Sequence, residues 1–203
     1  MKAEVGNTQA IGHFRTLAGL LCILTGVLAT GMGIFHFTLG QEGHLLHGMR
    51  FYRDWMGVMA FIVVSGFCMW WRMVRSTGKS LWPEGSRRYL FAFLAPLVAG
   101  SIVSYELASG YDEFELCALC WVMCYGAGLV SVRQVAPVSL PLPGGWKFLI
   151  AGALITFFWR SYGAAFAPQL GVGEPEAAAV IMILCFGLFH LVQGAMFLLG
   201  KGK

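Results

Sequence analysis

Six long apolar runs alternate with short polar segments along the chain. About 20 apolar residues in a helix cross the hydrocarbon core of a bilayer. In that core every backbone N–H and C=O must find a partner within the protein, which favours helices. The pattern therefore predicts an all-α polytopic membrane helix bundle with six transmembrane helices, in which residues 1–203 form a single membrane domain. The predicted spans are roughly 15–37, 55–75, 89–108, 115–134, 147–167 and 176–199.

The composition agrees with a membrane domain and leaves little chain for anything else. Of the 203 residues, 58% are hydrophobic and 12% are charged, whereas a soluble domain carries about 25% charged residues. Six spans use about 120 residues, so we expect short connections and no separate soluble domain. The first run is too long for a cleaved signal peptide, and we expect it to remain as the first span.

The charged residues sort by sign between alternate polar segments and the span ends beside them. Eight of the ten acidic residues belong to one set, which holds only Arg50, Arg53 and Arg160 as basic residues. Lys and Arg resist translocation, so the other set is predicted to be cytoplasmic, with both chain ends inside a bacterial inner membrane. The net charge of +4 is then a topology signal, and we expect no nucleic-acid partner. The cytoplasmic set comprises Lys2, Arg15, Arg72, Arg75, Lys79, Arg87, Arg88, Arg133, Lys147, Lys201 and Lys203.

Small residues recur at helical spacing in the first, fourth and last spans. Since a helix turns by about 100° per residue, each set falls on one face, where small side chains let helices approach closely in lipid. We predict helix-packing seams there. The shared spacing in spans one and four also fits a three-plus-three inverted repeat, although such stripes are common in membrane helices. The stripes are Gly19, Cys22, Gly26, Thr30 and Gly33; Cys117, Cys120, Cys124, Gly128 and Ser131; and Gly187 with Gly194.

Five spans bring an ionisable side chain to the predicted outer face. A charged group near the membrane edge extends toward the interface or pairs with another group. One interpretation is a ring of independent interface anchors. The other is a polar vestibule that binds a small ligand, a lipid head group or a partner, which requires the side chains to converge. The five residues are His36, Asp54, Glu106, Glu115 and Arg160.

His190 is the deepest ionisable residue, roughly 20 Å below the outer start of the last span. It is either a neutral histidine bonded at a helix crossing or part of a ligand site or proton relay. A haem with two axial histidines is not expected, because His36 lies about 20 Å away in depth. His44 and His47 lack a third ligand, so we expect no metal site and no cofactor.

Cys117 and Cys120 stand three residues apart near the predicted outer start of the fourth span. The helix dipole there favours a thiolate. The string Cys-x-Leu-Cys-Trp resembles the DsbB family, the quinone-linked thiol oxidases of the bacterial envelope. That resemblance implies a redox-active Cys117–Cys120 pair and a quinone. The chain departs from the family in having no second cysteine pair in its outer loops, and in Cys124 where the family has Arg. The alternative is that these cysteines are small residues of the packing stripe.

A second resemblance covers about the last 90 residues. Glu115-Leu116, Trp121, Tyr125-Gly126-Ala127-Gly128, Ser131-Val132-Arg133 and the segment Phe186-Gly187-Leu188-Phe189-His190-Leu191-Val192-Gln193-Gly194 carry it. They resemble a family of six-helix bacterial membrane proteins whose activity is uncharacterised. The resemblance implies the six-helix topology. It also implies that the cysteines at 117 and 120 are local substitutions.

These features favour a non-enzymatic membrane protein that acts through helix packing and its outer face, as an accessory or subunit of a larger envelope complex. Its expected partners are membrane lipid and other membrane subunits. A small transporter or ligand-binding protein with an outward vestibule is the first alternative. A thiol–quinone oxidoreductase using Cys117 and Cys120 is the second. No protease, zinc or phosphate-loop motif occurs in the sequence.

Overall fold

A computed structural model describes residues 2–41, 48–76, 84–111, 113–135, 144–163, 169 and 173–200. All the longer regular elements of that part of the chain are helices, which confirms the all-α prediction. His44 and His47 lie outside the described residues. The helices are α1 (Lys2–Gln41), α2 (Gly48–Ser76), α3 (Glu84–Gly110), α4 (Phe114–Val135), α5 (Gly145–Phe158), η1 (Trp159–Gly163), α7 (Glu174–Met182), η3 (Ile183–Leu188) and α8 (Phe189–Leu199).

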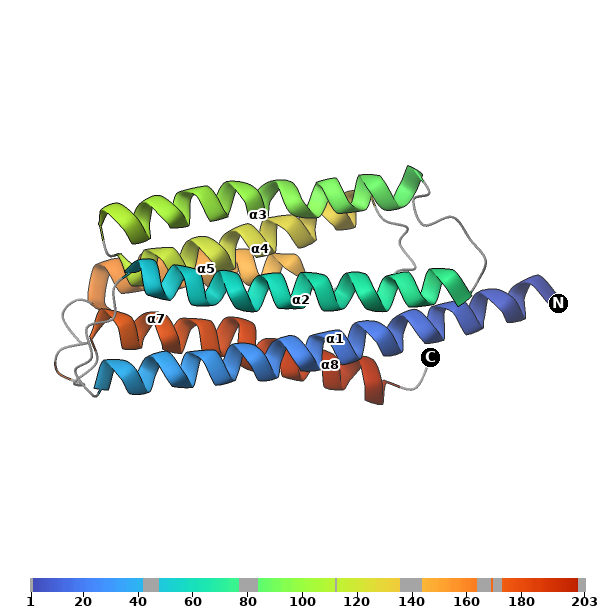
Figure 1. Ribbon diagram of the computed structural model, residues 1–203, viewed down its shortest axis with the longest axis horizontal. Coiled ribbons are helices and arrows are strands. Elements are labelled where there is room, and N and C mark those ends of the chain that lie inside the picture. Colours follow the sequence, from blue (N-terminus) through green and yellow to red (C-terminus); the bar gives the residue numbers. More distant parts are fainter. Residues whose placement is uncertain are drawn as a thin grey trace.

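The helices run back and forth along one long axis (Figure 1). The elements α7, η3 and α8 follow one another without a break, and we call them together the C-terminal helix. Charged side chains sort largely by sign to the two ends of the bundle, although Arg50 and Arg53 of α2 lie at the acidic end. The acidic end holds all six described carboxylate side chains: Asp54, Glu106, Glu113, Glu115, Glu174 and Glu176. The basic end holds Arg15, Arg72, Arg75, Arg87, Arg88, Arg133 and Lys147.

Five helices within the described residues are long and apolar enough to cross a membrane. They are Arg15–Gln41, Gly48–Met69, Arg87–Gly110, Phe114–Gln134 and Glu174–Leu199.

Of the remaining predicted span, 147–167, the structure describes the residues up to Gly163. The apolar α-helix ends at Phe158, and wider π-helical turns continue to Gly163. The fourteen α-helical residues rise about 21 Å of the roughly 30 Å hydrocarbon core, and the five residues of the π-helical turns extend the same helix further. The hydropathy of the sequence indicates an apolar segment here, but it does not indicate where an α-helix changes to π-helical turns.

The fourth helix, α4, lies at the centre of the bundle. It packs against α3, α5 and α7, while α1 packs along the whole C-terminal helix and touches α2. The main core cluster joins these elements through buried residues such as Phe51, Trp121 and Met182. In the most apolar window of α4, 56% of the residues are buried, against 11% for α2. The helix α2 is therefore peripheral, and most of its side chains are not covered by other helices of the described part of the chain.

Candidate functional site

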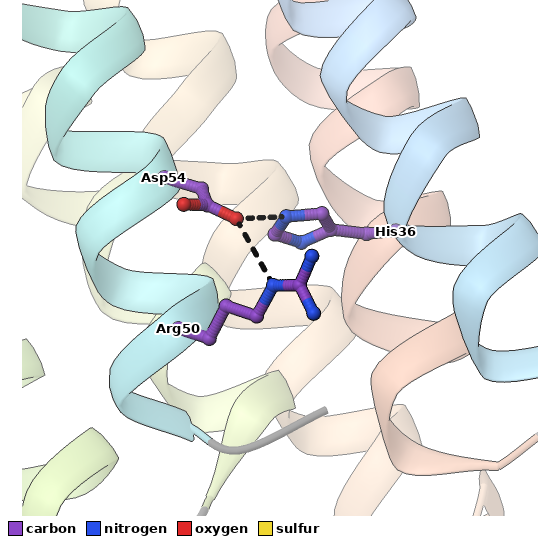
Figure 2. Close-up of polar contacts among 3 residues, drawn as sticks. All are labelled: His36, Arg50 and Asp54. Carbon is purple, nitrogen blue, oxygen red and sulfur yellow. Dashed lines mark hydrogen bonds and ion pairs between the residues drawn. The ribbon is translucent and has the colours of Figure 1, made fainter. Parts of the chain in front are cut away.

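A polar contact between α1 and α2 lies at the acidic end (Figure 2). Nε2 of His36 is 3.2 Å from Oδ2 of Asp54. The same oxygen is 3.8 Å from Nε of Arg50, one turn earlier on α2. His36 is 0% exposed, whereas Asp54 is 24% and Arg50 is 42% exposed. One carboxylate thus links a fully buried imidazole to a guanidinium at the surface of the bundle.

Aromatic rings surround His36. The centroids of Phe51, Phe35 and Trp55 lie 5.1, 5.7 and 6.3 Å from that of the imidazole. The guanidinium carbon of Arg50 lies 5.9 Å from the centroid of Phe35. Nδ1 of His36 is buried and has no hydrogen-bond partner among the described residues. Apolar surroundings strengthen an imidazole–carboxylate contact, so it ties α1 to α2. It is also able to pass a proton between the two side chains.

Glu115 of α4 makes a separate contact at this end of the bundle. Its carboxylate is buried in the first turn of that helix and accepts a hydrogen bond of 3.2 Å from Nε1 of Trp159. A carboxylate near a helix N-terminus is favoured by the exposed backbone N–H groups. This contact joins α4 to the π-helical turns that follow α5, at the same end of the bundle as His36 and Asp54.

The five residues predicted to form an outer vestibule therefore fall into groups. His36 meets Asp54, and Glu115 meets Trp159. Glu106 is exposed, and the side chain of Arg160 lies outside what the structure describes. Among the described side chains, no hydrogen bond or ion pair connects the His36 group to Glu115. The described groups act as ties between neighbouring helices.

A further acidic contact escaped the sequence reasoning. Oε1 of Glu176, buried in the first turn of α7, accepts a hydrogen bond of 3.3 Å from Nε2 of Gln41. Gly40 lies beside this carboxylate, which fills the space that a side chain at position 40 would occupy. A signal existed in the sequence: Gly40 continues the seven-residue spacing of Gly26 and Gly33 on α1.

Deeper in the bundle, His190 meets Tyr125. The hydroxyl oxygen of Tyr125 on α4 is 2.8 Å from Nε2 of His190 on α8. The imidazole is 2% exposed and stacks on Phe186, with an interplanar angle of 8°. The rings of Phe148 and Phe189 lie 5.6 and 6.1 Å away from it. A packed aromatic cluster therefore holds His190 at a helix crossing, with its Nε2 satisfied by a single hydroxyl.

Gly19, Gly26 and Gly33 of α1 lie against the C-terminal helix. A methyl group at Gly26 would lie 2.9 Å from the carbonyl oxygen of Gly187, and one at Gly194 would lie 2.8 Å from that of Gly19. Gly33 faces Ile183 and the carbonyl of Ala179, and Cys22 is buried in the same helix. The two helices approach closely along this seam because glycines on either helix leave room for the backbone or side chains of the other.

The cysteines of α4 lie against α3. Sγ of Cys117 is 3.8 Å from the carbonyl oxygen of Ser104, and Sγ of Cys120 is 3.6 Å from that of Gly100. Cys124 packs on Gly100. Further along the seam, a methyl group at Gly128 would lie 3.0 Å from the carbonyl oxygen of Phe93. All six cysteines are free thiols, and Cys117 is fully buried.

No group of three or more His, Cys, Asp or Glu residues in the described part of the chain is arranged to hold a metal ion. Comparisons with models of known families, with curated proteins and with solved structures found no match. Both resemblances noted in the sequence therefore stay predictions. The structure supports a polytopic helical membrane protein, because five helices of its described part are long and apolar enough to cross a membrane.

Proposed function

We propose that this protein is a non-enzymatic subunit or accessory of a larger complex in the bacterial inner membrane. It acts through helix packing and through its acidic end. The observation that carries this proposal is the use of the buried polar groups. His36 with Asp54, Tyr125 with His190 and Glu115 with Trp159 each join two helical elements. Such pairs hold a scaffold together, and a scaffold recognises partners by its shape and surface charge.

The proposal places the acidic end outside the cytoplasm and both chain ends inside. The separation of charges supports this orientation, because the seven described cations at the opposite end would resist translocation. The exposed acidic side chains Glu106 and Glu174 then face the periplasm, where they present negative charge to a partner. Complementary charge of this kind selects partners and speeds their encounter.

Extraction of the tagged chain from its native membranes in a mild detergent tests the proposal. We expect it to migrate in an assembly with defined stoichiometry, well above its own mass of 22.2 kDa. Glu106→Gln with Glu174→Gln should release the partner, while Lys147→Gln, which removes an exposed charge at the basic end, serves as the control. Recovery of a lone monomer from native membranes, or equal release by both variants, would refute the proposal.

A ligand-binding protein is the second candidate, favoured by one observation. Nδ1 of His36 is a buried nitrogen without a described partner, beside the partly exposed carboxylate of Asp54. Such a nitrogen is available to a small polar ligand or a proton entering from the acidic end. His36→Ala and Asp54→Asn should then abolish ligand binding or flux in proteoliposomes. If both variants behave as the parent protein does, this candidate fails.

A further inference from the structure

The basic end of the bundle carries seven described cationic side chains, and Glu4 of α1 and Glu84 of α3 belong to the same end with side chains outside the described part of the chain. Its seven described cations come from α1, α2, α3, α4 and α5, and every described acidic side chain lies at the other end. A fixed positive surface attracts anions from its surroundings. At the edge of a membrane, the abundant anions are the head groups of acidic phospholipids.

Three of these arginines belong to α2 and α3. Arg72 and Arg75 are exposed in the last turns of α2, and Arg87 is exposed near the start of α3. The guanidinium carbon of Arg75 lies 5.3 Å from the centroid of Trp71, and Trp71 contacts Phe67 at 6.0 Å. A cation–π contact of this kind attracts the guanidinium to the face of the indole ring without using its N–H donors. This geometry suits bidentate hydrogen bonds to a phosphate.

The two helices diverge toward the basic end (Figure 1). They are tied together near the acidic end, where the hydroxyl oxygens of Tyr52 and Ser101 lie 3.0 Å apart. Beyond that tie, apolar side chains are open on both helices: Val64 of α2 is 61% exposed, and Phe91 of α3 is 68% exposed. Both helices therefore present apolar side chains between this tie and their arginines.

We propose that α2 and α3 together bind an anionic phospholipid at the basic end. Arg72, Arg75 and Arg87 hold its phosphate, and its acyl chains lie along Val64 and Phe91. Charge complementarity selects this occupant, since a zwitterionic lipid offers the same chains but brings a cation to the arginines. An acidic protein segment would match the charge and leave the apolar flanks unused. This inference is independent of the proposed function.

Native mass spectrometry of the full chain in detergent tests the proposal, with phosphatidylglycerol and phosphatidylcholine of identical acyl chains as probes. We expect retained phosphatidylglycerol and little retained phosphatidylcholine. Arg72→Gln, Arg75→Gln and Arg87→Gln should each lower the affinity for phosphatidylglycerol about fivefold. The control is Arg53→Gln, which removes an exposed arginine of α2 near the acidic end and should leave the affinity unchanged.

Three outcomes would overturn the proposal. Equal retention of the two lipids would show that the arginines do not select an anion. An equal loss of affinity in Arg53→Gln and in the three basic-end variants would show an effect of net charge alone. Soluble glycerol phosphate serves as a third probe. If it competes as well as the lipid does, the apolar flanks contribute nothing and the site is one for free phosphate. All the substituted arginines are exposed, so thermal unfolding of each variant should match the parent protein.

Discussion

The seam between α1 and the C-terminal helix gives the sharpest test of how this bundle is held together. We predict that Gly26→Ala destabilises the protein. The added methyl carbon would lie 2.6 Å from Cγ of Leu191, 2.8 Å from its backbone nitrogen and 2.9 Å from the carbonyl oxygen of Gly187. Two of these three atoms belong to the backbone of the facing helix, so a change of rotamer cannot relieve the overlap. The helices must move apart.

Overpacking of this kind costs about 1–3 kcal/mol, and Gly to Ala returns up to about 1 kcal/mol through helix propensity. We therefore expect a net loss of about 1–2 kcal/mol in the free energy of unfolding. Gly31→Ala is the matched control, because Gly31 lies on the same helix and has open space around its Cα. That variant should be neutral or slightly stabilised.

Thermal unfolding in detergent, followed by circular dichroism, measures both variants. The melting temperature of Gly26→Ala should fall by several degrees, and that of Gly31→Ala should not fall. If the two variants melt together, or if Gly26→Ala is the more stable, then the close approach of these backbones does not determine stability and the packing described here is wrong.

Three further predictions concern the Tyr125–His190 contact, the burial of Cys117 and the orientation in the membrane. Tyr125→Phe leaves Nε2 of His190 without its partner and should cost about 0.5–2 kcal/mol in the same unfolding assay; Tyr162→Phe, at an exposed position, should cost nothing. A membrane-permeable maleimide should label Cys68, which is exposed, well before Cys117, which is buried; faster labelling of Cys117 would contradict its place in the α3–α4 seam. In whole cells an impermeant maleimide should label Glu106→Cys directly and Arg87→Cys only after permeabilisation; the reverse order would invert the proposed orientation.

The sequence by itself determined the class of this protein. The apolar runs and the low charge content predicted an all-α membrane protein, and five helices able to cross a membrane agree with that prediction. The period of seven between Gly19, Gly26 and Gly33 placed these residues on one face of α1, because helix geometry alone relates spacing to direction. The sorting of charges likewise indicated that acidic and basic groups would gather at opposite ends.

Only the tertiary structure decided which faces meet. Periodicity identifies the packing face of a helix and says nothing about its partner. Tyr125 and His190 are 65 residues apart, and Gln41 and Glu176 are 135 apart, so no local pattern could pair them. The predicted vestibule residues also depended on packing, since His36 and Asp54 meet only because α1 and α2 lie side by side at that end. The change to π-helical turns after Phe158 was decided by backbone geometry, which hydropathy does not encode.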